Sequence, residues 1–233
     1  MELKYKRVLL KMSGEVLGTE GSPVDSERVA QAASHIKELY DAGVQIGVVL
    51  GGGTIMRGRS AVGVERNRAD NIGMLATAIN SLAMEQALIN LGVPVRVLSA
   101  IEIEMFMDTY SARLAQSSLD KGEVVIFACG TGVPFFSTDT AAAIRAAQIH
   151  ADAILLAKNI DGVYSADPKV DKTAVKYDTL TYGDVVQRGL RATDLTAITL
   201  CSETKLPVIV FSMQDDGAFV RAVMGENVGT VIS

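Results

Sequence analysis

Three consecutive glycines, Gly51, Gly52 and Gly53, directly follow an apolar, β-branched stretch over residues 45–50. Such a stretch is typical of a strand that is buried on both faces of a parallel sheet. Because glycine lacks a Cβ, its backbone N–H groups approach an anion closely, and glycine turns at strand ends bind phosphate in many α/β proteins. Arg57 follows within reach, and a guanidinium binds two phosphate oxygens at once. Alone, this pattern also fits a tight turn beside a surface arginine.

Strand-like and helical patterns alternate along the whole chain. Strands are predicted over residues 7–12, 45–50, 93–98, 123–129, 152–158, 207–211 and 229–232. Helices are predicted over residues 25–41, 70–91, 110–120, 140–150, 180–200 and 217–224, with a loop over 16–24 and no assignment for 54–69 or 101–107. This alternation predicts an α/β protein with a mostly parallel open sheet sandwiched by helices.

Two of the predicted helices have features that the sequence explains directly. Asp25 or Ser26 is placed to cap the first helix, and Gly43 is placed to end it. In the helix predicted from Asp70, a buried stripe is expected from the apolar residues Met74, Leu75, Ala78, Leu82 and Leu88.

Composition limits the class of protein. The 233 residues are 48% hydrophobic, which is enough for one large domain or two closely joined lobes. Lys and Arg number 22 against 27 Asp and Glu, and this acidic balance argues against a general nucleic-acid or membrane-surface binder. The N-terminus lacks the apolar core of a signal peptide, and we expect no membrane-spanning segment and a cytoplasmic location.

Lys11 ends an otherwise apolar strand, where a lysine is costly unless its ammonium group has an anionic partner. Phosphate is one such partner, although a strand-end lysine also reaches water by extending its side chain. Glycine turns follow this strand at Gly14 and a later strand at Gly130 and Gly132. Because ligands bind at the carboxyl ends of strands in an open sheet, these turns predict one extended phosphorylated ligand or two ligands that meet.

Three aspartates are candidate site residues. Asp139 and Asp194 suit partners for cationic groups, and Asp70 suits an acceptor for ribose hydroxyls. Capping and the helix dipole alone also explain these positions, above all that of Asp139. Phe135 and Phe136 suit either a wall for a nucleotide base or plain core.

Several familiar sites are missing from the sequence. It has no P-loop motif, no dinucleotide-binding G-x-G-x-x-G after the first strand, no nucleophile elbow and no Cys/His metal cluster. The two cysteines, Cys129 and Cys201, lie in apolar stretches without a C-x-x-C pattern, so we expect both to be reduced and structural.

Five segments together resemble the amino acid kinase family and, within it, the bacterial uridylate kinases. They are residues 11–15, residues 51–53 with Arg57, Asp70 before Gly-Met-Leu-Ala-Thr, residues 131–139 and residues 158–168. The resemblance covers essentially the whole chain, and the Pro-Phe-Phe segment and the Asp-Gly-Val-Tyr loop are its specific parts.

The resemblance implies transfer of the γ-phosphoryl group of ATP to UMP in pyrimidine nucleotide biosynthesis, with Mg²⁺ accompanying ATP. It implies a homohexamer with GTP and UTP as effectors, and residues 18–21 match a stretch linked to the GTP response. It also implies one domain over residues 1–233 with a soft boundary near residue 158, between an acceptor-binding part and an ATP-binding part.

Roles for single residues follow from the same resemblance. The catalytic residues would be Lys11, Asp139 and Asp194. ATP would bind Lys11, Ser13, Gly14, Gly53, Arg57, Asn159, Tyr164 and Asp167. UMP would bind Gly52, Asp70, Thr131, Gly132, Val133, Pro134, Phe135, Phe136, Ser137 and Thr138, and no residue would be a dedicated metal ligand.

This chemistry suits the residues present. Phosphoryl transfer needs positioning and charge stabilisation, which Lys11, Arg57 and backbone N–H groups supply. The phosphate of UMP is already an anionic nucleophile, so no general base is needed. Two alternatives stay open: a carboxylate or carbamate kinase of the same family, and a nucleotide-sensing regulator with the same fold.

Overall fold

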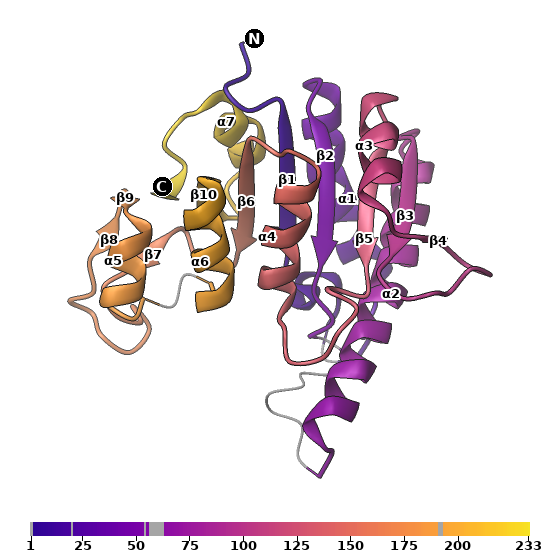
Figure 1. Ribbon diagram of the computed structural model, residues 1–233. Helices are drawn as coiled ribbons and strands as arrows, with labels where there is room; N and C mark the ends of the chain where they lie inside the picture. The colour runs from indigo at the N-terminus through magenta and orange to yellow at the C-terminus, as the bar shows by residue number, and fades with distance from the viewer. Residues whose placement is uncertain (1, 20, 54, 56–62, 191–192) are drawn as a thin grey trace.

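The computed structural model describes residues 2–19, 21–53, 55, 63–190 and 193–233. Within these residues, nine strands form one sheet in the order β4-β3-β5-β2-β1-β6-β10-β11-β9 (Figure 1). Their bounds are β1 (Arg7–Met12), β2 (Gln45–Leu50), β3 (Val95–Ser99), β4 (Asp108–Thr109), β5 (Val124–Ala128), β6 (Ala153–Lys158), β9 (Thr179–Leu180), β10 (Val208–Ser212) and β11 (Gly229–Ile232). A separate hairpin pairs β7 (Val163–Tyr164) with β8 (Lys176–Tyr177).

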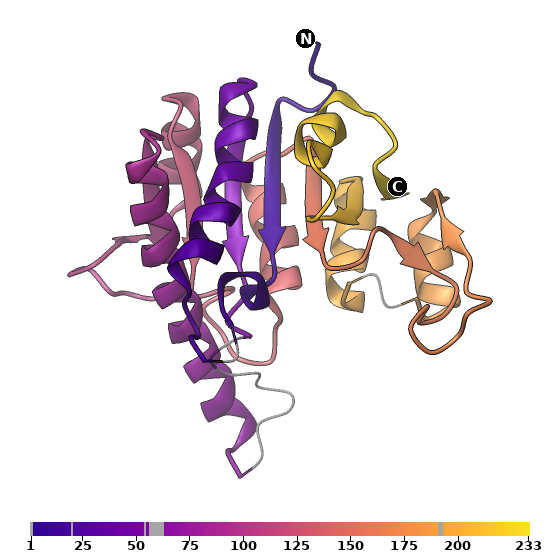
Figure 2. The ribbon, with the colours of Figure 1, turned by 180° about the vertical axis from the view of Figure 1, so that it is seen from behind.

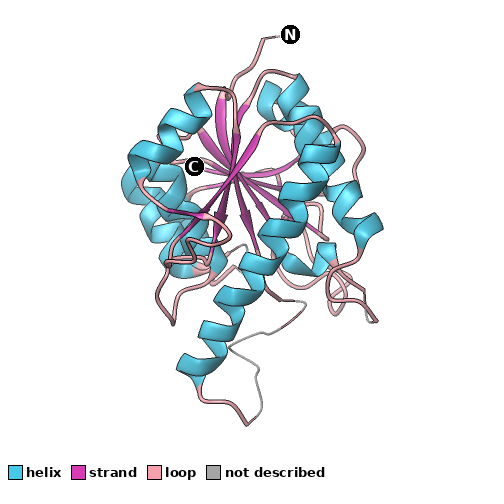
Figure 3. Cartoon of the chain, turned by 90° about the vertical axis from the view of Figure 1, so that its right-hand side faces the viewer, coloured by secondary structure: helices cyan, strands magenta, loops and turns pink. Residues whose placement is uncertain are grey.

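Helices cover both faces of the sheet (Figures 2 and 3). On one face lie α1 (Ser26–Asp41), α2 (Arg66–Asn90) and α7 (Ala218–Met224). On the other face lie α3 (Ala112–Asp120), α4 (Thr138–Gln148), α5 (Tyr182–Gln187) and α6 (Leu195–Thr204). The predicted α/β sandwich is therefore confirmed.

The order of the strands places β1 at a switch point. β1 pairs in parallel with β2 on one side and with β6 on the other. Among the described strand pairs of this sheet, only β10–β11 is antiparallel. Because the chain leaves β1 in one direction and later returns on its other side, a crevice for ligands opens at the carboxyl ends of β1 and β6.

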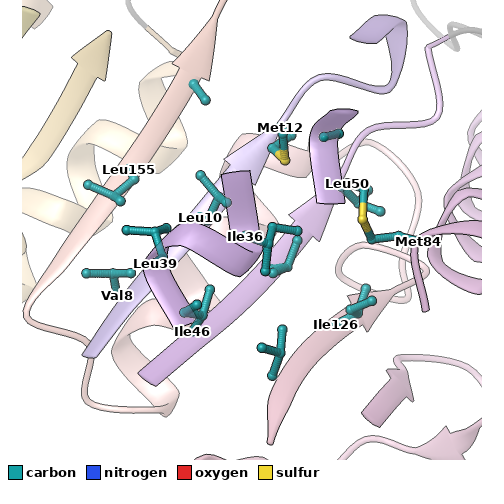
Figure 4. Close-up of a cluster of buried hydrophobic side chains, with 14 of the residues drawn as sticks. Val8, Leu10, Met12, Ile36, Leu39, Ile46, Leu50, Met84, Ile126 and Leu155 are labelled. Carbon is teal, nitrogen blue, oxygen red and sulfur yellow. The ribbon is translucent and has the colours of Figure 1, made fainter. Parts of the chain in front are cut away.

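The core follows from the alternation of side chains along β1. Val8 and Leu10 pack with Ile36 and Leu39 of α1 and with Ile46 of β2 (Figure 4). Leu9 of β1 faces the opposite way, into the cluster beneath α3, α4 and α6. Both faces of β1 are thus buried, as the unbroken apolar sequence predicts.

The first helix begins and ends as expected. The Asp25 carboxylate accepts hydrogen bonds from the N–H groups of Glu27 and Arg28. Gly43 follows the helix with a φ of +83°, a conformation that glycine adopts without strain.

Helix α2 differs from its prediction. It begins at Arg66 rather than Asp70, and Leu75 is 51% exposed instead of lying in a buried stripe. The rest of the predicted stripe is confirmed: Ala78 and Leu88 are buried, and Met74 and Leu82 are partly buried against the core. The buried face also carries small and polar residues such as Ala76 and Thr77. They are needed because a Cβ placed on Gly52 would lie 2.6 Å from the carbonyl oxygen of Gly73 and 3.0 Å from the Cβ of Ala76.

The length and composition of α2 bear on the expectation that no segment spans a membrane. Its 25 residues are apolar enough to cross a membrane by those two criteria alone, although no such segment was expected. Core helices of soluble proteins meet the same criteria, and α2 packs against α1 and β3.

Other boundaries shift for local reasons. A 3₁₀-helix, η1 (Gly14–Leu17), occupies the start of the predicted 16–24 loop and the turn before it. The helix expected over 140–150 spans Thr138–Gln148, because Ser137 caps it. The helix expected over 180–200 divides into α5 and α6, with Thr181 and Asp194 as their separate caps.

Candidate functional site

A cavity of about 670 Å³ opens where β1 and β6 end. Lys11 and Ser13 lie on one side of it, and the chain that follows β6 forms a second wall. Arg188 and Leu190, just after α5, line it as well. From the predicted site, the lining residues are Lys11, Ser13, Asn159, Tyr164 and Asp167.

Lys11 forms a buried ion pair with Asp139. Only 9% of Lys11 is exposed, and its Nζ lies 2.7 Å from Oδ1 of Asp139. The other carboxylate oxygen of Asp139 accepts a hydrogen bond from the Thr193 hydroxyl at 2.8 Å. Ser137, not Asp139, caps α4 by accepting the N–H groups of Asp139 and Thr140. Asp139 is therefore not the cap, although it lies in the first turn, where the helix dipole favours an acidic residue. Its side chain pairs with Lys11.

Lys158, at the end of β6, is a second site lysine that the prediction missed. Burial lowers its pKa, and the charge of Lys11 lowers it further, against the opposing attraction of Asp139 and Asp194. Burial alone would raise the pKa of Asp139, yet Lys11 and Lys158 together hold it below the usual carboxyl range. Two ammonium groups and two carboxylates, those of Asp139 and Asp194, thus act on one another at the ends of neighbouring strands. A lysine ending a wholly apolar strand, the pattern that singled out Lys11, also marked Lys158.

Asp194 caps a helix and also joins two helices. Its carboxylate accepts the N–H of Ala197 at 2.8 Å, which confirms the capping role at the start of α6. It also accepts hydrogen bonds from the hydroxyls of Ser137 and Thr140 at the start of α4. The two helix N-termini, each with a positive dipole end, are therefore held side by side next to the lysines.

The predicted glycine turn at Gly14 touches the turn that begins at Gly51. A Cβ on Gly14 would lie 2.2 Å from the carbonyl oxygen of Gly51, so only glycine permits this approach. The Asn80 side chain of α2 donates to the same carbonyl at 2.7 Å. Gly52 and Gly53 continue this turn, whereas Arg57 lies outside the described residues.

The segment over residues 131–138 forms an exposed rim that is tied to α2. The Asp70 carboxylate accepts the N–H of Phe135 at 2.9 Å and pairs with Arg66 Nε at 2.7 Å. Phe135 has a φ of +73° and is 62% exposed, and Phe136 is exposed too, so neither belongs to the core. The Arg66 guanidinium lies 5.6 Å from the Phe135 ring. Arg66 was not predicted as a site residue; its spacing of four residues from Asp70 was the available indication.

Within this rim, two further turns fix the backbone. The Thr131 hydroxyl donates to the carbonyl of Val133 at 2.9 Å. Gly132 has a φ of +81°, and a Cβ there would lie 2.9 Å from the Ala100 carbonyl oxygen. Pro134 and Thr138 complete the segment, and Thr138 begins α4.

The loop after β6 is organised around Asp161. Its carboxylate accepts the Tyr164 hydroxyl at 2.9 Å and pairs with Lys176 Nζ at 3.0 Å. Asp167 accepts the N–H of Lys169 at 2.9 Å and so closes a local turn. These contacts hold Tyr164 and Asp167 at the edge of the cavity.

The cysteines take no part in this arrangement. Cys129 and Cys201 are both free and buried, as predicted. Burial raises the pKa of both thiols, that of Cys201 to about 12, so neither is a thiolate at neutral pH.

Cationic groups gathered at the carboxyl ends of parallel strands suit a phosphotransferase, because such groups stabilise the charge of transferred phosphoryl groups. The model of the amino acid kinase family matches residues 6–212. The chain belongs to the amino acid kinase family.

Solved structures resemble the chain over nearly its whole length. A UMP kinase from Bacillus anthracis is 40% identical, with a TM-score of 0.95, and the match covers 98% of this chain and 96% of that one. A UMP kinase from Ureaplasma parvum is 37% identical, with a TM-score of 0.92, covering 99% and 100%. A uridylate kinase from Archaeoglobus fulgidus is 33% identical, with a TM-score of 0.73, covering 97% and 99%.

Proposed function

We propose that this chain is a UMP kinase, which transfers the γ-phosphoryl group of ATP to UMP and releases ADP and UDP in pyrimidine nucleotide biosynthesis. The observation that carries the proposal is the buried cluster of Lys11, Lys158 and Asp139 beside the cavity. The similarity to UMP kinases at 37 to 40% identity supports UMP as the acceptor.

In this proposal ATP occupies the cavity between the two lysines and the loop after β6. Asn159, Tyr164 and Asp167 hold the adenine nucleotide, and Ser13, Gly14, Gly53 and Arg57 bind its phosphates. Negative charge spreads over the phosphoryl oxygens in the transition state, and the ammonium groups of Lys11 and Lys158 face that charge in a poorly hydrated site. Asp139 pairs with Lys11 and opposes the lowering of the Lys158 pKa, while Asp194 fixes the helix that carries Asp139.

UMP in turn occupies the rim made by α2 and residues 131–138, with Gly52 at its inner end. Asp70 binds ribose hydroxyls, and its fixed position rests on Arg66 and the Phe135 N–H. Exposed Phe135 and Phe136 offer apolar area to a base. The uridylate phosphate already carries negative charge near neutral pH, so it attacks without a general base.

Mg²⁺ enters this scheme as part of the substrate Mg-ATP. Among the described residues, no three His, Cys, Asp or Glu side chains are grouped to hold a metal ion. Mg²⁺ commonly keeps several waters and binds nucleotide phosphates with one or two carboxylates, and its charge neutralises the phosphates. Asp139 and Asp194, whose charges act on Lys158, would orient the metal-bound nucleotide without being dedicated metal ligands.

The proposal extends to organisation and location. The part before about residue 158 binds the acceptor and the part after it binds ATP, within one domain over residues 1–233. The chain assembles as a homohexamer, responds to GTP and UTP, and works in the cytoplasm. Exposed apolar side chains on α2, Leu75, Ile79 and Ile89, support assembly.

The test is ADP release from Mg-ATP with UMP, beside CMP, dUMP, aspartate, N-acetylglutamate and carbamate. Fast turnover with UMP and little with the others is the expected result. Activity with a carboxylate or carbamate instead would mean a different acceptor within the same family. Tight UMP binding without turnover would favour the nucleotide-sensing regulator.

A further inference from the structure

Thr230 lies in the middle of β11 and is completely buried. Its backbone belongs to the main sheet, where Thr230 is paired with Val210 of β10. Its hydroxyl points away from that ladder and accepts the N–H of Val163 at 2.8 Å. The same hydroxyl donates to the carbonyl oxygen of Tyr177 at 2.5 Å.

The two groups bound by this hydroxyl come from opposite strands of the β7–β8 hairpin. Val163 and Tyr177 are directly paired in that hairpin. One side chain of the main sheet therefore bridges both hairpin strands. This buried hydroxyl makes one hydrogen bond as donor and one as acceptor. Its removal would leave the Val163 N–H and the Tyr177 carbonyl without these hydrogen bonds.

Two glycines show how closely β11 approaches the loop after β6. A Cβ on Gly229 would lie 3.0 Å from the carbonyl oxygen of Asp161. A Cβ on Gly162 would lie 2.7 Å from the Thr230 hydroxyl oxygen itself. The loop is thus seated directly on β11, and the Thr230 hydroxyl lies at the contact.

This contact fixes a wall of the cavity. Gly162, Val163 and Tyr164 all line the cavity, and the Val163 amide that Thr230 binds is at the centre of this stretch. Tyr164 is further held by Asp161, which is the loop residue that packs over Gly229. Thr230 lies beyond residues 6–212, the part that the family model matches.

We propose that Thr230 is a positioning residue for the phosphoryl donor: its hydroxyl sets the loop over residues 161–164 against β11 and so shapes the nucleotide-binding wall. This role rests on the proposed binding of Mg-ATP in the cavity. Both described hydrogen bonds of the Thr230 hydroxyl go to the β7–β8 hairpin, so its effect is expected on donor binding and not on acceptor binding.

The test compares Thr230→Val with Thr230→Ser in the full chain. Valine keeps the shape of threonine but has no hydroxyl, whereas serine keeps the hydroxyl. Titration calorimetry with Mg-ATP should show about tenfold weaker binding for Thr230→Val and near wild-type binding for Thr230→Ser. The KM for UMP should stay within about twofold of wild type in both variants. Equal Mg-ATP affinity in the wild type and Thr230→Val would overturn the proposal, as would equal losses in the two variants.

Amide hydrogen exchange supplies a readout that needs no nucleotide. In Thr230→Val the Val163 amide should exchange faster, while the Val231 amide, which donates to Asp178, keeps its protection. Unchanged exchange at Val163 would contradict the bridge.

If the valine variant folds poorly, Thr230→Ser and Thr230→Ala form a second pair that differs by the hydroxyl oxygen alone. Wild-type protein that binds no Mg-ATP would instead contradict the proposed function.

Discussion

Lys11, the last residue but one of β1, and Lys158, the last of β6, lie on neighbouring strands. Asp139 pairs with Lys11, and Asp139 and Asp194 both attract Lys158, in a space where water is largely excluded. Such burial is costly for the lysines in the absence of further anions. Nucleotide phosphates would supply those anions. We therefore expect the arrangement to lower the stability of the free protein and to favour binding of a phosphorylated ligand.

Replacing Lys11 by alanine should lower kcat by about 100-fold or more, because the variant lacks a cation that faces transition-state charge. The dissociation constant for UMP, measured by calorimetry, should change by less than about threefold, since Lys11 is expected to contact the phosphoryl group being transferred rather than UMP. Lys37→Ala removes a partly exposed lysine that pairs with Asp41 on α1 and is the matched control. Equal losses of turnover and UMP binding in Lys11→Ala would contradict the role given to this residue.

Lys158→Met should also lose about 100-fold in kcat yet be at least as stable as wild type at neutral pH. The reason is the lowered pKa of Lys158: its charged form is disfavoured in the folded state. That cost is fully present below the folded pKa and disappears as pH rises toward the ordinary value of 10.5. Urea unfolding at neutral and alkaline pH measures the free energy of unfolding of both proteins. The difference in favour of Lys158→Met should be smaller at alkaline pH. A variant that is less stable at neutral pH but fully active would refute this account.

At the scale of elements, the site depends on how closely η1, β2 and α2 approach one another. The contact between Gly14 and Gly51, and that between Gly52 and α2, leave no room for a side chain. The glycine run in the sequence predicted an anion-binding turn. The structure adds that the same glycines set the spacing of three elements.

Gly14→Ala should lower the stability of the fold, because its Cβ would meet the backbone oxygen of Gly51 at 2.2 Å. Overpacking of this kind costs about 1–3 kcal/mol, which calorimetry detects as a lower Tm. Gly21→Ala is the control, since no atom lies within 4 Å of a Cβ at that position. The same Tm for both variants would show that the turn relaxes freely.

The sequence predicted most of the fold, because the central strands are continuous apolar runs and the helices between them have clear ends. It misplaced the start of α2 because Asp70 looked like a cap, whereas Asp70 binds Arg66 and the N–H of Phe135. It misjudged Leu75 because helical periodicity does not reveal that the buried face must be small next to a glycine turn. Thr230 was beyond prediction, since its partners are 67 and 53 residues away.

At the scale of the whole molecule, the switch point at β1 joins two functions. The strands on one side of β1 lead to the rim that is proposed to bind the acceptor, and β6 leads to the wall of the proposed nucleotide cavity. Lys11 lies on β1 itself, between the two. This position explains how one strand end can serve both substrates.

The outer face of α2 bears on assembly. Leu75 and Ile79 are half-exposed apolar side chains one helical turn apart. Leu75→Glu combined with Ile79→Glu should convert a large assembly into smaller species, measured by light scattering after size-exclusion chromatography, because burying these carboxylates is costly. Gln31→Glu, on exposed α1 surface, should leave the mass unchanged. A wild-type mass near 24.7 kDa, or a double variant that keeps the full mass, would contradict assembly through this face.

The most direct measurement is the identity of the product. The purified chain is incubated with Mg-ATP and UMP, and the nucleotides are separated and quantified over time. UDP and ADP should form in equal amounts, with neither formed when UMP is omitted and both nearly lost in Lys11→Ala. ADP released without UDP, or no reaction while both nucleotides bind, would contradict the phosphoryl transfer that the cluster of Lys11, Lys158 and Asp139 is proposed to perform.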